Sequence, residues 1–292
     1  MSAEEGVAMS SFDFSDWVGR QQRQSDQLSA TPARALAATL DREESYELGD
    51  ALPGLWHWLY FLPLHRQSEL GVDGHAKRGG FLPPVPLPRR MWAGGQLNWH
   101  QPLKIGDSVE RVSTIKSVTH KSGKTGDLVF VAVEHAISNA QGLAMTEVHD
   151  IVYRGNPPAS AHGAPMAAGE LAPTDADFER SLTPDDVLLF RYSALTFNGH
   201  RIHYDRRYVT TEEGYPGLVV HGPLIATLLV DLVRRQPGLG PLRSFDFRAI
   251  RPTFDGHPMK VCGKAMDDGQ VSLWAQDHQG FLTMKATAVV AA

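Results

Sequence analysis

FNGHRIHYDRRYVTTEEGYPGLVVHGPL, residues 197–224, is the most informative part of this chain. It carries three histidines and a Gly-Tyr-Pro-Gly turn, and its last residues run into the apolar segment LIATLLVDLV. Proline in the first turn of a helix loses no hydrogen bond, and the two arginines after the apolar segment suit the negative end of the helix dipole. The sequence therefore predicts a buried helix over residues 223–235, with the free N–H group of Gly222 at its positive end.

The histidines before this helix offer proton-transfer chemistry. The start of a helix can hold an anion or a developing oxyanion, and a histidine exchanges protons near neutral pH. Two other interpretations of the same residues stay open. His200, His203 and Asp205 have a spacing that suits zinc or iron if a further ligand arrives from elsewhere. His203 also fits an ordinary hydrogen-bonded core histidine.

The same stretch resembles the second hydratase motif of the MaoC-like hydratases and dehydratases, which are hot-dog-fold enzymes acting on acyl thioesters. That motif reads Asp-x-Asn-x-x-His, followed by a Gly-x-x-Gly turn and a His-Gly pair. His203 falls on the catalytic histidine, whereas Asn198 stands where the family has its catalytic aspartate. The longer string FRYSALTFNGHRIHYD, residues 190–205, is similar to the subgroup of type 2 hydroxyacyl-thioester dehydratases and mesaconyl-C4-CoA (3-methylfumaryl-CoA) and itaconyl-CoA hydratases.

The resemblance implies a hydro-lyase that adds water to, or removes it from, a short branched dicarboxylic enoyl-CoA such as mesaconyl-C4-CoA or itaconyl-CoA. It implies no metal and no cofactor besides the CoA of the substrate. Three alternatives stay open: an acyl-CoA thioesterase, a 3-hydroxyacyl-thioester dehydratase of fatty-acid type, and a non-catalytic acyl-binding protein.

Three catalytic roles follow from the resemblance. His203 would be the acid or base, the backbone N–H of Gly222 would donate to the thioester oxyanion, and Asn198 would position water or the thioester. An asparagine exchanges no proton at neutral pH, so the second acid/base role is unassigned. Either one well-placed residue takes and returns the proton on the same face, or His200 or a chain of water molecules shares that work.

The candidates for substrate binding lie beside the motif and in a long insertion, residues 64–95, which is basic within an acidic protein. An arginine can hold a carboxylate or a CoA phosphate through two charge-assisted hydrogen bonds. Long loops are usually functional or disordered, so a solvated proline-rich connection is the alternative. The predicted substrate-binding residues are Arg201, His200, His221, Arg89 and Arg90, with Arg78 as a further clamp candidate; next to the helix start, the His221 ring is also expected to orient a loop.

Two short matches indicate an internal repeat. The turns at residues 101–107 and 251–257 each place Gly four residues after Pro and lie between probable strands. Each half then reads as a helix followed by antiparallel strands, with the first helix predicted over Thr31–Glu43. The pattern predicts an α+β double hot-dog fold, with long helices wrapped by antiparallel sheets. The N-terminal half, 1–160, would be a degenerate substrate-binding wall, and the C-terminal half, 161–292, would carry the catalytic motif.

Composition limits the function further. The chain has 292 residues, a net charge of −5 and one cysteine, which favours a reducing cytoplasm and gives no reason to expect nucleic-acid binding. The most apolar stretches, 52–64 and 218–233, are too short for a membrane span. Within the first, LWHWLYF predicts a strand with Trp56 and Trp58 on one face. Because exposed sheet edges often pair, we also expect a homodimer.

Overall fold

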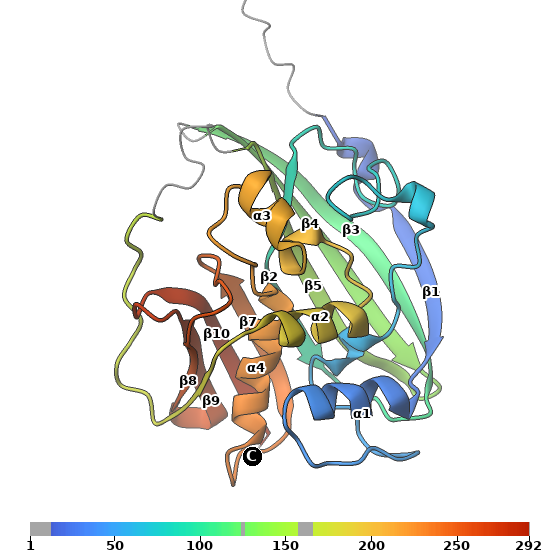
Figure 1. Ribbon diagram of the computed structural model, residues 1–292. Helices are drawn as coiled ribbons and strands as arrows, with labels where there is room; N and C mark the ends of the chain where they lie inside the picture. The colour runs from blue at the N-terminus through green and yellow to red at the C-terminus, as the bar shows by residue number, and fades with distance from the viewer. Residues whose placement is uncertain (1–12, 124–125, 157–165, 292) are drawn as a thin grey trace, which may run out of the picture.

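The computed structural model describes residues 13–123, 126–156 and 166–291, which form one strongly curved antiparallel sheet with helices along one face (Figure 1). The strands are β1 (Gln21–Gln27), β2 (Arg89–Trp99), β3 (Ser108–Gly123), β4 (Gly126–Asn139), β5 (Gly142–Arg154), β6 (Phe178–Leu182), β7 (Leu242–Ala249), β8 (Met259–Ala265), β9 (Gln270–Gln276) and β10 (Leu282–Val290). The α-helices are α1 (Ala30–Thr39), α2 (Asp186–Leu195), α3 (Arg206–Thr211) and α4 (Gly222–Arg234).

The strand order shows how the two halves join. Along the sheet the order is β1-β3-β4-β5-β2-β7-β10-β9-β8-β6, so the strands of each half lie together and the pair β2–β7 connects them. The structure confirms the predicted α+β double hot-dog fold, with both halves sharing one continuous sheet. The predicted boundary at residue 160 falls outside the described residues and stays a prediction.

The helix predicted at the end of the motif is α4, and every residue from Leu224 to Val233 is buried. It packs against β8, β9 and β10, in front of which Figure 1 shows it. Pro223 lies in its first turn, as predicted. Burying one leucine, isoleucine or valine side chain contributes roughly 1.5–3 kcal/mol. This helix therefore anchors the core of the second half and fixes the place of its own N-terminus.

The first-half helix, α1, is shorter than predicted. It follows Ser29, which makes no side-chain cap, and ends at Thr39 instead of Glu43. The chain leaves the helix at Asp41, whose φ of 55° is left-handed and ends the helical path. Composition alone did not indicate this turn. The helix lies beside α2, so the two halves contact each other through helices as well as strands.

The predicted strand at Trp56 and Trp58 was wrong, because Trp56–Leu59 form a short 3₁₀ helix. Leu55 before it has a left-handed φ of 69°, which a continuous strand does not allow. Trp56 is buried with its ring centroid 5.1 Å from that of Tyr46. Trp58 turns instead toward β5, where its indole N–H donates to the carboxylate of Glu147 at 2.8 Å.

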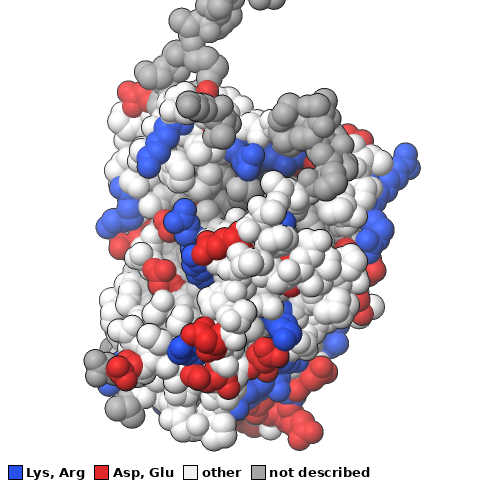
Figure 2. Space-filling view, turned by 90° about the vertical axis from the view of Figure 1, so that its left-hand side faces the viewer, with Lys and Arg blue, Asp and Glu red and all other residues white. Residues whose placement is uncertain are grey.

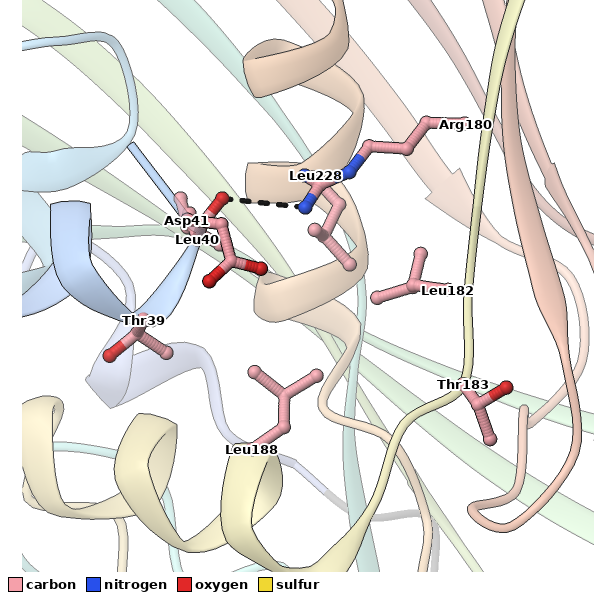
Figure 3. A pocket seen from close by; sticks show the side chains of 8 residues that line it. All are labelled: Thr39, Leu40, Asp41, Arg180, Leu182, Thr183, Leu188 and Leu228. Atoms are coloured by element: carbon pink, nitrogen blue, oxygen red, sulfur yellow. Dashed lines mark hydrogen bonds between the residues drawn. The ribbon is translucent and has the colours of Figure 1, made fainter. Parts of the chain in front are cut away.

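The carboxylate of Asp231 joins α4 to its neighbours. It is fully buried and accepts hydrogen bonds from Arg42 (3.0 Å), Arg180 (3.1 Å) and Arg235 (2.7 Å). Arg180 also donates to the carbonyl of Leu40 at 3.3 Å, on the wall of a small pocket between α1, α2 and α4 (Figure 3). The guanidinium group at this pocket is thus already engaged by the protein, so the pocket offers a ligand no free cation.

The surface carries charges of both signs. Figure 2 shows acidic and basic side chains interspersed, with a large uncharged area between them and no extended basic patch on this face. In the part of the chain that the structure describes, no helix is both long and apolar enough to cross a membrane.

We predict that Asp231→Ala lowers the free energy of unfolding by about 3 kcal/mol, since removing one partner of a buried ion pair leaves the others without compensation. The three arginines keep some exposure to water, so the loss falls at the low end of the usual range. Urea unfolding measures it, with the exposed Glu43→Ala as control. A loss equal to that of the control would contradict a structural role for this carboxylate.

Candidate active site

The motif, the long insertion and the inner face of β3, β4 and β5 meet at one large cavity of about 1720 Å³. Residues from both halves of the chain line it. The motif supplies the wall from Tyr192 to Gly222, and the insertion lines the cavity next to it. The sequence placed candidate residues in both segments, and the structure brings these segments together.

His203 is buried at the cavity wall, in a short 3₁₀ helix that follows α2. Its Nδ1–H donates to the carbonyl of Val219 at 2.6 Å, which leaves the lone pair of Nε2 without a partner among the described residues. Burial lowers the pKa of His203 to about 4, although the bond to Val219 opposes the shift. The ring is therefore neutral near pH 7, and Nε2 can accept a proton.

His221 lies behind His203 and does not line the cavity. Its ring stacks on that of His203 with the centroids 3.7 Å apart, and its Nε2 is 2.8 Å from the hydroxyl of Ser193. It is completely buried, so a substrate in the cavity does not reach it. We therefore replace the predicted substrate-binding role of His221 with a positioning role, in which it holds the plane of the His203 ring.

The N-terminus of α4 begins directly after His221. The N–H of Gly222 has no hydrogen-bond partner among the described residues, as expected for the first turn of a helix. A Cβ atom on Gly222 would meet nothing within 4 Å, so the space over this residue is open. The stack of His221 on His203 places this free donor beside the His203 ring. The arrangement can hold a negatively charged oxygen next to a proton acceptor.

Asn198 and His200 lie on the cavity wall before His203. The side-chain oxygen of Asn198 accepts the backbone N–H of His200 at 3.0 Å, so its amide nitrogen is the atom left for a ligand. The ring of His200 stands perpendicular to that of His203, with 5.4 Å between the centroids. Burial lowers the pKa of His200 well below its usual value, and its ring has no hydrogen-bond partner among the described residues.

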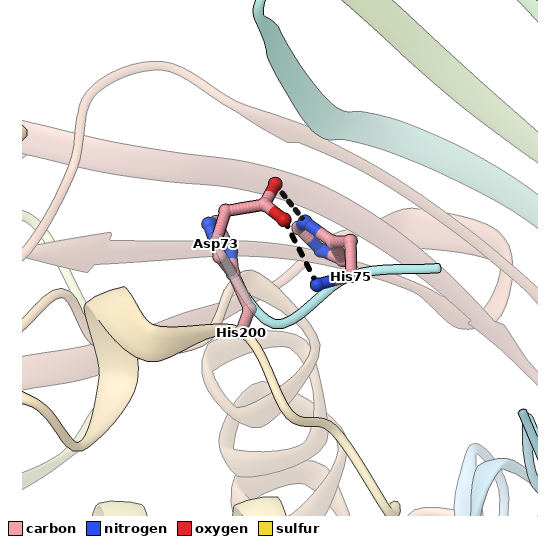
Figure 4. A group of neighbouring side chains, drawn as sticks. All are labelled: Asp73, His75 and His200. Atoms are coloured by element: carbon pink, nitrogen blue, oxygen red, sulfur yellow. Dashed lines mark hydrogen bonds and ion pairs between the residues drawn. The ribbon is translucent and has the colours of Figure 1, made fainter. Parts of the chain in front are cut away.

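The insertion adds two groups that the sequence did not single out, Asp73 and His75 (Figure 4). The ring of His75 lies 3.9 Å from that of His200, and Asp73 accepts a hydrogen bond from His75 Nδ1 at 3.0 Å. Ligand atoms of the three residues lie within 4.8 Å of one another, a spacing that a metal ion could use. The sequence signal was Asp-Gly-His within a long loop, but nothing local tied it to the motif.

Two predicted substrate-binding arginines are occupied by the protein itself. Arg201 binds the carboxylate of Asp205 at 2.7 Å and the carbonyl of Val72 at 2.9 Å. Arg89 binds the carboxylate of Glu213 at 3.0 Å. The bond from Arg201 to Val72 joins the insertion to the motif segment, and the pair of Arg89 and Glu213 joins β2 to it. Arg201 and Arg89 are thus better placed to hold the cavity walls than to bind a ligand.

Arg90 differs from its neighbours. It lines the cavity, is half-buried and has no carboxylate partner among the described residues. It is close enough to His75 and His200 that its charge lowers the pKa of both. Arg78 donates instead to the carbonyls of Val85 and Pro88, which fixes the insertion. Arg90 bonds the hydroxyl of Tyr153 and is thus the predicted arginine that neither a carboxylate nor a backbone carbonyl among the described residues holds.

A second polar cluster lies on the wall formed by the first half. Glu147 on β5 is completely buried and binds His57 (2.9 Å), Trp58 (2.8 Å) and His149 (2.6 Å). Burial favours the neutral carboxyl, but His149 and His57 outweigh it and hold the pKa of Glu147 well below its usual value. The sequence signal for this cluster was a glutamate and a histidine two residues apart on one strand, Glu147 and His149. This signal lies outside the motif.

Comparison with known proteins identifies the family of the chain. Residues 55–255 match the profile of the family described as hydroxyacyl-thioester dehydratase type 2. The chain is 46% identical over 283 residues to the mesaconyl-C(4)-CoA hydratase of Chloroflexus aurantiacus, covering 96% of this chain and 98% of the relative. It is 28% identical to the mitochondrial hydroxyacyl-thioester dehydratase type 2 of Schizosaccharomyces pombe, covering 81% and 88%.

Solved structures show the same fold at low identity. A MaoC-like dehydratase from Phytophthora capsici superposes with a TM-score of 0.67 at 15% identity, covering 94% of this chain and 96% of that one. A Mycobacterium tuberculosis protein described as a double hotdog superposes with a TM-score of 0.56 at 14% identity, covering 94% and 96%. The protein is a hydro-lyase of double hot-dog fold. The chain belongs to the hydroxyacyl-thioester dehydratase type 2 family.

The low pKa of His203 predicts that acid destabilises the protein. The unfolded chain takes up a proton on this residue near its ordinary pKa of 6.5, whereas the folded chain does so only near about 4. The contribution of neutral His203 to the free energy of unfolding is therefore fully present above pH 6.5 and is lost as the pH falls toward 4. Chemical unfolding at several pH values measures the loss, which for this residue reaches up to about 3 kcal/mol. His203→Gln should flatten the dependence, and an unchanged slope in that variant would contradict the assignment.

Proposed function

We propose that this hydro-lyase adds water across the C2=C3 double bond of a short branched dicarboxylic enoyl-CoA, with mesaconyl-C4-CoA as its substrate. The identity to the Chloroflexus hydratase over nearly the whole of both chains supports this substrate. One observation carries the chemistry: neutral His203, with its unpaired Nε2, stacks on His221 directly before the free N-terminus of α4, on the wall of a large cavity. Itaconyl-CoA, the other substrate considered from the sequence, has no separate support.

The proposed reaction begins at His203. Its Nε2 takes a proton from water as the water oxygen bonds to C3, and the electron pair of the double bond moves toward the thioester oxygen. The N–H of Gly222 donates to that oxygen, and one such donor is worth about 100- to 1000-fold in rate. The amide nitrogen of Asn198 is free to hold the water or the thioester. C2 then takes up a proton to complete the hydration.

The free carboxylate of the substrate needs a cation close to the reacting carbon. In 3-methylfumaryl-CoA this carboxylate is attached to C3, the carbon that receives the hydroxyl group. Arg90 meets the requirement, since its charge acts on the pKa of His75 at the same wall. Arg111, another cavity arginine without a carboxylate partner among the described residues, packs over Phe61 and binds Gln24 in the first half. We assign the carboxylate clamp to Arg90.

We propose that the reaction uses no metal and no cofactor besides the CoA of the substrate. The chemistry requires a base, an oxyanion donor and an acid, all of which side chains and backbone can supply. We also propose a homodimer in the cytoplasm, with neither nucleic acid nor membrane as a partner. The open edges at β1 and β6 support pairing with a second copy, and the single buried Cys262 suits a reducing compartment.

The test is a turnover assay with mesaconyl-C4-CoA. The wild-type protein should remove the absorbance of the conjugated enoyl thioester without releasing free thiol. His203→Ala should lower kcat by about 100- to 10,000-fold while the melting temperature stays near that of the wild type. Release of thiol in place of hydration would show a thioesterase. A folded His203→Ala variant that keeps more than a tenth of the rate would exclude His203 as the base.

Arg90→Ala should separate substrates by their carboxylate. Losing a charge-assisted clamp costs about 1.5–3 kcal/mol, which is roughly 10- to 100-fold in kcat/KM. We expect this loss with mesaconyl-C4-CoA and little change with crotonyl-CoA, which has no free carboxylate. Arg207→Ala, an exposed arginine on α3, is the matched control, and Arg111→Ala tests the competing cation. Equal losses of kcat/KM on both substrates in Arg90→Ala would exclude Arg90 as the group that binds the substrate carboxylate.

A further inference from the structure

The proposed hydration leaves the donor of the proton at C2 unassigned. His203 takes a proton from water and either returns it to C2 on the same face or leaves C2 to a second acid, and Asn198 has no proton to exchange at neutral pH. The missing group must reach the cavity near His203 and must carry a proton that can leave. Two histidine rings on this wall meet the first condition, His200 and His75. Their partners distinguish them.

Of these two histidines, His75 is the one whose ring is hydrogen-bonded to a carboxylate. Asp73 accepts the backbone N–H of His75 and its Nδ1–H, each at 3.0 Å. The Nε2 atom of His75 is left without a partner among the described residues. By contrast, the ring of His200 has no bonded group, and that of His203 has a backbone carbonyl. A carboxylate stabilises the charged form of an imidazole, whereas a carbonyl does so more weakly.

The backbone fixes His75 in this place. Gly74 has a φ of 88°, and a Cβ atom on it would lie 1.8 Å from the carbonyl oxygen of Gly199, so only glycine permits the approach. The N–H of Arg201 donates to the carbonyl of Asp73 at 2.9 Å. The insertion thus docks on the motif loop through backbone contacts on both sides of the Asp-Gly-His turn. Such contacts hold His75 beside His200 whether or not a ligand is present.

We infer that His75 is the second acid/base residue of the hydration, and that Asp73 positions it and stabilises its imidazolium; this inference rests on the proposed function. His203 takes a proton from water, and the water oxygen bonds to C3. The electron pair of the double bond moves to C2 and the thioester oxygen, and C2 takes the proton from Nε2 of His75. His203 then releases its proton to solvent, and His75 takes one up, so the cycle consumes only water.

The groups around His75 set when it carries a proton. Burial lowers the pKa of His75, Asp73 opposes the shift, Arg90 lowers the pKa further and Glu213 raises it. The neutral ring of His200 packs on its face. A substrate carboxylate bound to Arg90 offsets the positive charge there, so the bound substrate itself favours the protonated acid. An enoyl-CoA without that carboxylate does not offset the charge of Arg90 and so does not favour the protonated ring.

A metal ion is the competing use of Asp73, His75 and His200. The geometry favours proton transfer instead. Asp73 already bonds to His75 through both carboxylate oxygens. The rings of His75 and His200 also pack against each other, tilted by 38° with their centroids 3.9 Å apart. Figure 4 shows Asp73 directed at His75.

The experiment compares His75→Ala, His75→Gln and Asp73→Asn with the exposed His100→Ala, using mesaconyl-C4-CoA. In folded His75→Ala and His75→Gln, kcat should fall by about 100- to 10,000-fold with KM nearly unchanged. Asp73→Asn should show a smaller loss of kcat. Added imidazole should restore part of the rate of His75→Ala, which a purely structural role would not allow. The wild-type rate should fall as the pH rises through the pKa of His75, and His75→Gln should lack that limb.

Three outcomes would overturn the inference. If wild type and His75→Ala hydrate the substrate at similar rates, His75 is not the acid and the proposed function still stands. If EDTA abolishes the activity and added Zn²⁺ restores it, the three residues form a metal site instead. If the wild-type protein hydrates neither mesaconyl-C4-CoA nor crotonyl-CoA, the proposed function fails and the inference fails with it.

Discussion

The hydrogen bond from His203 Nδ1 to the carbonyl of Val219 is the interaction on which the site depends. A carbonyl only accepts, so this bond fixes the tautomer and directs the lone pair of Nε2 away from it. The stacked ring of His221 holds the plane, and α4 begins one residue later. The buried helix thus positions both the unpaired Nε2 of His203 and the free N–H of Gly222. A shift of α4 would displace both groups together.

The two halves contribute unequal parts to one cavity. The second half supplies His203, Asn198 and the start of α4, all close in sequence. The first half supplies a wall of strands and the insertion, which docks on the motif through Gly74. In this arrangement the half without the motif still contributes to the cavity, because a site between two halves needs only one copy of the motif.

The sequence predicted the structural features that depend on local residue patterns. The apolar run after His221-Gly222-Pro223 predicted α4 to within one residue at each end, because helix starts and stops have strong local signals. The spacing of the motif placed His203 and Asn198 on the same cavity wall. The sequence could not place His75, since that depends on a backbone contact between residues far apart in the chain. Nor could it rank the arginines, whose availability depends on which carboxylates the fold brings to them.

The most direct test of whether the protein hydrates the enoyl double bond is turnover of mesaconyl-C4-CoA in isotopically labelled water, with the products identified by mass spectrometry. We predict a CoA thioester that has gained one labelled hydroxyl oxygen and one solvent hydrogen, with no free CoA. Labelled oxygen in a released carboxylic acid, together with free CoA, would contradict it, since that result would mean the same oxyanion donor serves hydrolysis of the thioester.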